Sequence, residues 1–160
     1  MSFSRIVTLS LTHTATWVVG FAAGIYALPL LTAPPPPMVE VIAESNKTQR
    51  FIGEFDRDRK DSDQLHWGEG KFSINDNDIT FIGELAPGPN YKLYLSPKFI
   101  ETEADFLQQK AQLKLVGNVN TFENFVVSLD QSINPAEFDT VIIWCESFDQ
   151  FITSGRYNPQ

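Results

Sequence analysis

Two side chains of this 160-residue chain have the chemistry of a redox or ligand site: Cys145 and His66. Cys145 is the only cysteine, so the chain has no internal disulfide, no two-cysteine redox motif and no Fe–S cluster of its own. A single thiol can still cycle through sulfenic acid or a mixed disulfide, or ligate a haem iron. The structural alternative is a buried cysteine that packs as a small hydrophobic residue.

His66 stands near the start of an alternating segment, Leu65–Ile74, in which Phe72 and Ile74 occupy even positions. This alternation predicts a strand whose even face points inward. Three more residues share that face: His66, Gly68 and Gly70. The glycines would leave a strip without side chains, where a backbone or a flat ligand could approach closely. The alternative is a histidine hydrogen-bonded to a loop carbonyl, with a large aromatic side chain over the glycines.

The residue counts restrict the cofactor. His66 is the only histidine after the N-terminal segment, and Met38 is the only methionine there. A single-chain blue-copper site or structural zinc site would need more ligands than this. Non-covalent haem with one Cys or His ligand is the prosthetic group that stays open, and the cofactor is otherwise unknown. The serines follow no nucleophile motif, so we do not expect a stand-alone enzyme.

The elements that would position these residues are strands. From Phe51 onward, short alternating runs separated by turn residues predict an all-β domain, an antiparallel sandwich or barrel of about eight short strands. Thr140–Cys145 is apolar on both faces, which indicates a central strand covered on both sides, with Trp144 and Cys145 on opposite faces.

Further inward faces and one helix are expected. The inward residues of the other strands are predicted to be Ile79, Phe81, Leu85, Leu113, Leu115, Phe125, Val127 and Leu129. Thr102 and Asp105 could open a short helix that buries Phe99 or Phe106. Asn134-Pro135 has the form of a helix N-cap followed by a first-turn proline.

The charges divide the chain into an uncharged N-terminal segment and an acidic domain. Arg5 is the only charged residue before Met38, and the remainder carries 11 basic and 20 acidic residues. Ile6–Leu31 has no formal charge, and about 20 such residues cross a bilayer. Ala33 lacks the A-x-A pattern of a cleavage site and precedes a proline, so an uncleaved signal-anchor is favoured. We expect an anchor over 1–33, a proline-rich linker over 34–49 and a β domain over 50–160.

Orientation and partners follow from the same pattern. Arg5 before the apolar segment predicts a cytoplasmic N-terminus and an extracytoplasmic domain, periplasmic in a Gram-negative bacterium. The net charge of −8 argues against a nucleic-acid partner. The expected partners are the membrane and an envelope protein or redox partner. Gly20 and Gly24 are spaced for a helix-mediated dimer, although such pairs are common in apolar helices.

Five ordered segments carry a family resemblance: Phe51–Phe55, His66–Gly70, Gly88–Leu95, Leu115–Gly117 and Val141–Cys145. Over residues 51–157 the chain resembles the DM13 domain. The resemblance implies a β-rich, extracytoplasmic domain with a proposed electron-transfer role through its cysteine, as a free thiol or as a ligand. On this resemblance Cys145 carries the family cysteine and His66 the motif histidine. The chain departs from the pattern at Arg156 and lacks the DOMON or haem-binding partner that accompanies the family in animals.

Two functional hypotheses result. The first is a membrane-anchored DM13 protein that transfers electrons or senses redox state through Cys145, with the His66 ring within a few ångströms of the sulfur to favour a thiolate. Supporting positions would be Trp144, Gly68 and Gly70. The second is a non-enzymatic binding module of the cell envelope with a structural, buried cysteine. In that module Trp67, Tyr91, Tyr94 and Tyr157 are candidates for exposed aromatic residues.

Overall fold

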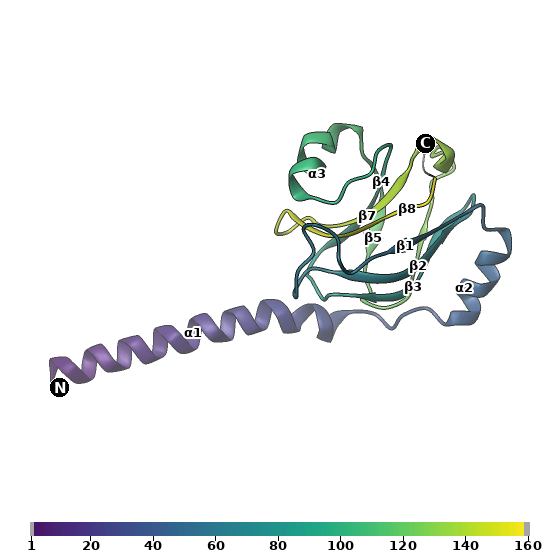
Figure 1. Cartoon of the computed structure of the whole chain (residues 1–160). Coiled ribbons are helices and arrows are strands. Elements are labelled where there is room, and N and C mark those ends of the chain that lie inside the picture. The colour runs from purple at the N-terminus through teal and green to yellow at the C-terminus, as the bar shows by residue number, and fades with distance from the viewer. Residues whose placement is uncertain (1, 159–160) are drawn as a thin grey trace. The chain divides into compact units, whose positions relative to one another are not determined.

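The computed structural model describes residues 2–158 and divides the chain into two compact units, Met1–Thr32 and Ala33–Gln160. The first unit is the helix α1 (Phe3–Thr32), 30 residues long with no buried residue (Figure 1). By length and composition α1 could cross a membrane, and a signal sequence near an N-terminus meets the same criteria. At 1.5 Å per residue it measures about 45 Å, longer than the hydrocarbon core of about 30 Å.

The second unit begins before the first strand. Residues 34–49, which we expected to form a linker, include the helix α2 (Val39–Ser45) and the 3₁₀ turn η1 (Asn46–Thr48). Ile42 is fully buried, and the Thr80 hydroxyl donates to the side-chain oxygen of Asn46 at 2.7 Å. The Asn75 amide donates to the Ser45 carbonyl at 2.9 Å. The end of the expected linker is therefore folded onto the β domain.

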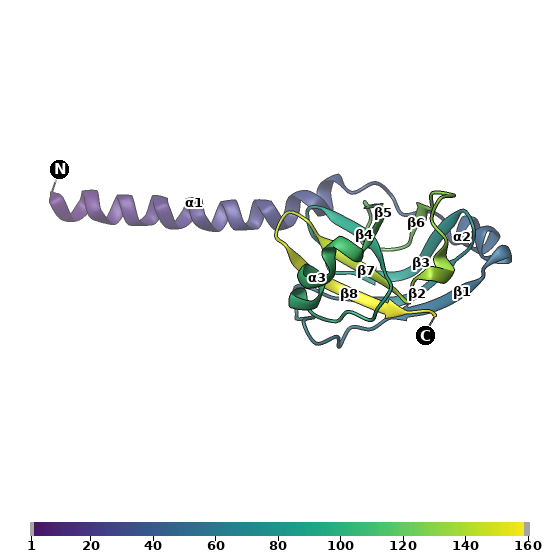
Figure 2. The same cartoon turned by 90° about the horizontal axis from the view of Figure 1, so that it is seen from above.

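Eight antiparallel strands form two four-stranded sheets, which Figure 2 shows from above. Sheet A has the order β1-β2-β3-β6 and contains β1 (Phe51–Phe55), β2 (Gly68–Ile74), β3 (Asp78–Leu85) and β6 (Phe125–Ser128). Sheet B has the order β5-β4-β7-β8 and contains β5 (Lys114–Val119), β4 (Tyr91–Ser96), β7 (Thr140–Cys145) and β8 (Gln150–Arg156). The term all-β fits this domain but not the whole chain, because α1 alone has 30 residues.

The main core lies between the two sheets, and a smaller core lies on the outer face of sheet B. The main core takes its residues from both sheets, including Phe72, Phe81, Ile143 and Cys145. The smaller core contains Tyr94, Ile100, Phe106, Ile142, Trp144 and Phe151. It includes the one buried residue of the helix α3 (Glu103–Gln109), and every residue of β7 is buried. The prediction of a central strand covered on both faces is thus confirmed.

Most predicted inward faces are confirmed, because Ile79, Phe81, Leu85, Phe125, Val127 and Leu129 all lie in the main core. The predicted inward position of Leu115 is wrong, because this residue is 49% exposed. The β4–β5 pairing contains an irregularity beside Leu93 and Tyr94, so simple alternation along β5 does not predict its inward face. Leu113 precedes β5 and packs against the smaller core instead.

The short helices start as predicted. The Thr102 hydroxyl accepts from the Asp105 amide at 3.1 Å at the start of α3, which buries Phe106. Phe99 lies outside α3, with the guanidinium groups of Arg59 and Arg156 over its ring at 5.2 and 4.5 Å. The Asn134 side chain caps the 3₁₀ turn η3 (Pro135–Glu137) by accepting from Ala136 at 3.2 Å.

The first and last strands of the domain, β1 and β8, approach each other at one side of the two sheets. A Cβ atom on Gly53 would lie 2.6 Å from the Arg156 carbonyl oxygen, and one on Gly155 would meet the Glu54 carbonyl. Real Cβ atoms are essentially never found below 3.0 Å from such atoms. Glycine at both positions therefore permits this close contact of the two backbones.

Candidate functional site

Cys145 is the last residue of β7, where it pairs with Tyr91 of β4 and Gln150 of β8. Its thiol is free, and the residue is only 2% exposed within the main core. Burial raises the pKa of the Cys145 thiol, and the nearby Glu146 carboxylate acts in the same direction. The backbone N–H groups of Phe148, Ser147 and Asn90 act to lower that pKa but do not outweigh burial. The thiol is therefore protonated at neutral pH.

A short turn between β7 and β8 follows the thiol. The Glu146 amide donates to the Asn90 carbonyl at 3.0 Å and holds the start of this turn against the loop before β4. Asp149 has a φ of 50°, a left-handed conformation that aspartate tolerates better than most residues. Phe148 is exposed. Reagents can reach the sulfur only when this turn or its surroundings move.

His66 lies in the loop before β2 rather than on the inward face of a strand, so the strand predicted from Leu65 begins three residues too early. The Asp63 carboxylate accepts from the amides of Leu65 and His66, at 2.6 and 2.8 Å, and this local turn delays the strand. Its second oxygen lies 3.0 Å from Nδ1 of His66. This hydrogen bond is the largest of the causes that lower the pKa of Asp63.

The structure gives His66 a carboxylate partner rather than a thiol partner. The hydrogen bonds of the His66 ring and amide among the described residues are both made to the Asp63 carboxylate. The thiol pKa is raised, which is opposite to the effect that a nearby imidazolium would have.

Gly68 and Gly70 form no open strip. A Cβ atom on Gly68 would lie 2.5 Å from the Thr153 side chain and 2.6 Å from that of Leu85. Gly70 has a φ of +141°, and a Cβ atom there would meet the Ile82 carbonyl and lie 2.6 Å from the Gly83 Cα. The strip that we expected to admit a backbone or a flat ligand is therefore occupied, by the backbone of Ile82 and Gly83 at Gly70 and by side chains at Gly68.

Trp144 lies on the outer face of sheet B, fully buried in the smaller core. Its indole stacks on the Phe106 ring, with centroids 3.8 Å apart and planes 6° from parallel. Tyr94 meets the same ring edge-on at 5.2 Å. Within the described residues the Trp144 Nε1 atom has no hydrogen-bond partner. Trp144 thus packs on the face of β7 opposite to the Cys145 thiol.

Sequence reasoning missed one polar pair beside this cluster. The Tyr94 hydroxyl donates to Oε1 of Glu146, and Oε2 of Glu146 lies 3.6 Å from Nζ of Lys110. Burial is the main cause that raises the pKa of Tyr94, and the Glu146 carboxylate adds to it. The alternation of β4 could have placed Tyr94 on the face opposite Leu93, but nothing in the sequence pattern links it to Glu146.

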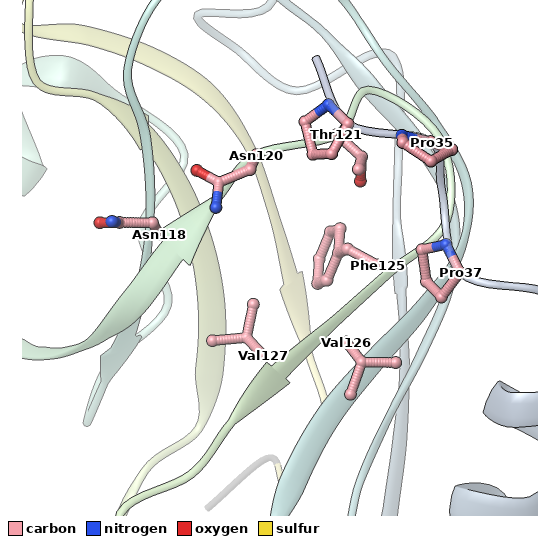
Figure 3. A pocket seen from close by; sticks show the side chains of 9 residues that line it. Pro35, Pro37, Asn118, Asn120, Thr121, Phe125, Val126 and Val127 are labelled. Carbon is pink, nitrogen blue, oxygen red and sulfur yellow. The ribbon is translucent and has the colours of Figure 1, made fainter.

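A cavity of about 300 Å³ opens between β5 and β6 (Figure 3). The Phe125 ring stands in it between Asn118 and Asn120 on one side and Pro35 and Pro37 on the other. None of its lining residues is charged: Pro34, Pro35, Pro37, Asn118, Asn120, Thr121, Phe125, Val126 and Val127. This lining suits an uncharged ligand that has hydrogen-bonding groups.

Two other described cavities are polar. One of about 500 Å³ is lined by residues 54–59 and Glu69, and one of about 290 Å³ adjoins Arg50 and Asp76. Neither Cys145 nor His66 lines any of these three cavities. In the part of the chain that the structure describes, no group of three or more His, Cys, Asp or Glu side chains could hold a metal ion.

Two antiparallel sheets around one buried free cysteine, with a separate long apolar helix, define a β-rich domain attached to a candidate membrane helix. The family described as Electron transfer DM13 matches residues 54–157, more than half of the chain. The chain therefore belongs to the DM13 family, which confirms the resemblance inferred from the sequence. No curated protein and no solved structure matches the chain.

Proposed function

We propose that this DM13 protein is a membrane-anchored electron-transfer or redox-sensing protein whose reactive group is Cys145. The observation that carries the proposal is the family match over residues 54–157, because the family is described by electron transfer and the match contains the only cysteine. The position of Cys145 at the end of β7, next to a turn, supports it further.

The proposed chemistry begins with a movement that exposes the sulfur. Once the turn after Cys145 opens, the thiol loses its proton to solvent, and the N–H group of Asn90, which lies outside that turn, favours the thiolate. With a hydroperoxide as the oxidant, the thiolate attacks one oxygen and the O–O bond breaks. The products are sulfenic acid and water or an alcohol, so the sulfur loses two electrons and the peroxide gains them.

Haem does not fit the closed domain at Cys145. The residue is 2% exposed, and it lines none of the three described cavities. We therefore propose no step through a haem.

The test of the thiol is oxidation of the natively purified full-length protein with dilute hydrogen peroxide. We expect a dimedone adduct to form at Cys145 and to be absent from Cys145→Ala, whereas the exposed Met38 gains one oxygen in both proteins. The visible spectrum is recorded before and after oxidation. Oxidation elsewhere with an unmodified Cys145 would contradict the proposal, and a native chromophore lost in Cys145→Ala would replace it with a ligand role.

The proposed membrane orientation rests on α1 and Arg5. The N-terminus stays in the cytoplasm and the β domain lies outside, because Arg5 lies in the first turn of α1 and the next lysine or arginine along the chain is Lys47. Protease added to spheroplasts should cleave the β domain and spare an N-terminal tag. Protection of the β domain would contradict this orientation.

The cavity between β5 and β6 favours a second candidate function, a binding module for an uncharged envelope ligand such as a sugar. Tyr91, Tyr94 and Tyr157, which we considered as exposed contacts, are buried, whereas Asn118 and Asn120 are exposed at this cavity. Binding to neutral glycans that is lost in Asn120→Ala and unaffected by Cys145→Ala would support this function. Equal binding by Asn120→Ala and the unmodified protein would exclude this cavity as the site.

A further inference from the structure

We propose that Tyr94 and Glu146 form a proton-coupled one-electron redox pair on the outer face of sheet B, with Trp144 as its aromatic relay; the inference rests on the proposed electron-transfer role. It concerns a different face of the sheet from Cys145. The geometry behind it is the hydrogen bond from the Tyr94 hydroxyl to Oε1 of Glu146.

A comparison within the domain shows why this tyrosine differs. Tyr94 and Tyr157 are equally buried, at 7% and 8% exposed. The Tyr157 hydroxyl donates to the Pro135 carbonyl at 2.8 Å, whereas Tyr94 donates to a carboxylate. A backbone carbonyl cannot take up a proton near neutral pH, but a carboxylate can. Tyr94 therefore has a proton acceptor already in place.

Oxidation of Tyr94 removes one electron and one proton from its phenol. One electron leaves the phenol ring for a one-electron oxidant, the O–H bond breaks, and its proton moves to Oε1 of Glu146. The products are a neutral tyrosyl radical and a neutral carboxylic acid, so no unpaired positive charge is left in the buried cluster. Burial and the Glu146 carboxylate raise the pKa of Tyr94, so the phenol keeps its proton until the electron is removed.

The proton also has a way out of the cluster. Glu146 is partly exposed, and its second oxygen lies 3.6 Å from Nζ of Lys110, which is more exposed still. Glu146 thus faces Tyr94 on one side and solvent on the other. After each oxidation the carboxylic acid can release its proton to water and return to the state that accepts the next one.

The aromatic contacts supply a relay to this pair. Trp144 stacks on Phe106 at 3.8 Å, and Phe106 meets Tyr94 at 5.2 Å. Because the buried Trp144 Nε1 atom has no partner among the described residues, an oxidised indole has no base to take its proton. An oxidised Trp144 therefore takes an electron from Tyr94, whose phenolic proton can move to Glu146. The oxidant in the cell would be a metal-centred one-electron acceptor, stronger than a tyrosyl radical, on a partner protein.

The test is flash photolysis of the full chain with photogenerated tris(bipyridine)ruthenium(III), in a Cys145→Ser, Tyr26→Phe background that removes thiol oxidation and the exposed Tyr26 phenol. We expect a tyrosyl radical, detected by its absorbance and electron paramagnetic resonance, whose formation is slower in D₂O. Tyr94→Phe should remove this isotope-sensitive phase, and the matched control Tyr157→Phe should retain it. Glu146→Gln should slow the phase by about 100-fold or more, the usual contribution of a positioned base. Trp144→Phe should slow the phase without removing the radical.

An isotope-sensitive phase that survives in Tyr94→Phe, or a rate unchanged in Glu146→Gln, would overturn the inference. Circular dichroism of each variant checks the fold, since Tyr94→Phe and Glu146→Gln preserve side-chain shape. Failure of Cys145 to react with peroxide would contradict only the proposed thiol function. Because the radical is measured without the thiol, the two failures are distinguishable.

Discussion

Trp144 and Cys145 are consecutive residues of β7 that face opposite sides of sheet B. The thiol lies in the core between the two sheets, and the indole lies against Phe106 of α3. The two faces of β7 can accordingly be tested by separate substitutions.

The buried thiol predicts a loss of stability at alkaline pH. The pKa of Cys145 is raised in the folded state, so the unfolded chain ionises first, near a pH of about 8.5. Below that pH the thiol has no effect on the pH dependence; above it, the free energy of unfolding falls until the pH passes the folded-state pKa. Urea unfolding at pH 7 and at about pH 9.5 should show a smaller fall for Cys145→Ala than for the unmodified protein. An identical fall in both would contradict burial of the thiol.

Removal of the Phe106 ring from the smaller core is predicted to lower the stability of the domain strongly. Phe106→Ala removes a buried ring that contacts both Trp144 and Tyr94, and should lower the free energy of unfolding by about 3–5 kcal/mol. The neighbouring Leu107 is half-exposed, so Leu107→Ala should change it by no more than about 0.5 kcal/mol. Urea denaturation of both variants measures the difference. Similar values for the two would mean that α3 does not cover sheet B in solution.

The backbone conformation and close contacts of Gly70 predict that only glycine is tolerated at this position. Gly70→Ala places a Cβ atom against the backbone of Ile82 and Gly83 at a φ of +141°, and should cost about 2 kcal/mol or more of stability. The control is Glu69→Ala on the exposed side of the same strand. Glu69 lies directly opposite Glu84, so its removal should be neutral or slightly stabilising. A thermal unfolding midpoint that stays unchanged in Gly70→Ala would contradict this backbone geometry.

The division into two units predicts that the β domain folds without α1. A chain beginning at Ala33 should be water-soluble and show the same cooperative unfolding transition as the domain of the full chain. The full-length protein should remain with the membrane fraction after extraction with alkaline carbonate. Release of the full-length protein by carbonate would mean that α1 does not span the bilayer.

Much of this fold could be predicted because simple alternation holds for buried strands. The inward faces of β3 and β6 and the doubly covered β7 all follow from apolar residues at period two or in a continuous run. Alternation failed at Leu115, beside an irregular strand pairing, and at His66, where the Asp63 carboxylate forms a local turn. Short-range hydrogen bonds and register shifts leave little trace in hydrophobic patterning.

The site was less predictable than the fold. Cys145 could be found because it is the only cysteine, and its buried strand was evident from the surrounding residues. The hydrogen bond of Tyr94 to Glu146 joins residues 52 positions apart, and it depends on the pairing of β4 with β7. The filling of the Gly68 strip by Thr153 likewise depends on which strand of the other sheet lies opposite. Such contacts follow from topology, which one sequence does not reveal.

The meeting of β1 with β8 has a consequence for how the protein is made. The first and last strands of the domain close one side of it, so that side cannot form until β8 has been synthesised. Contacts between such distant segments also slow folding, because a long loop must close first. Until β8 is in place, the edge of β7 that pairs with it lacks its partner strand.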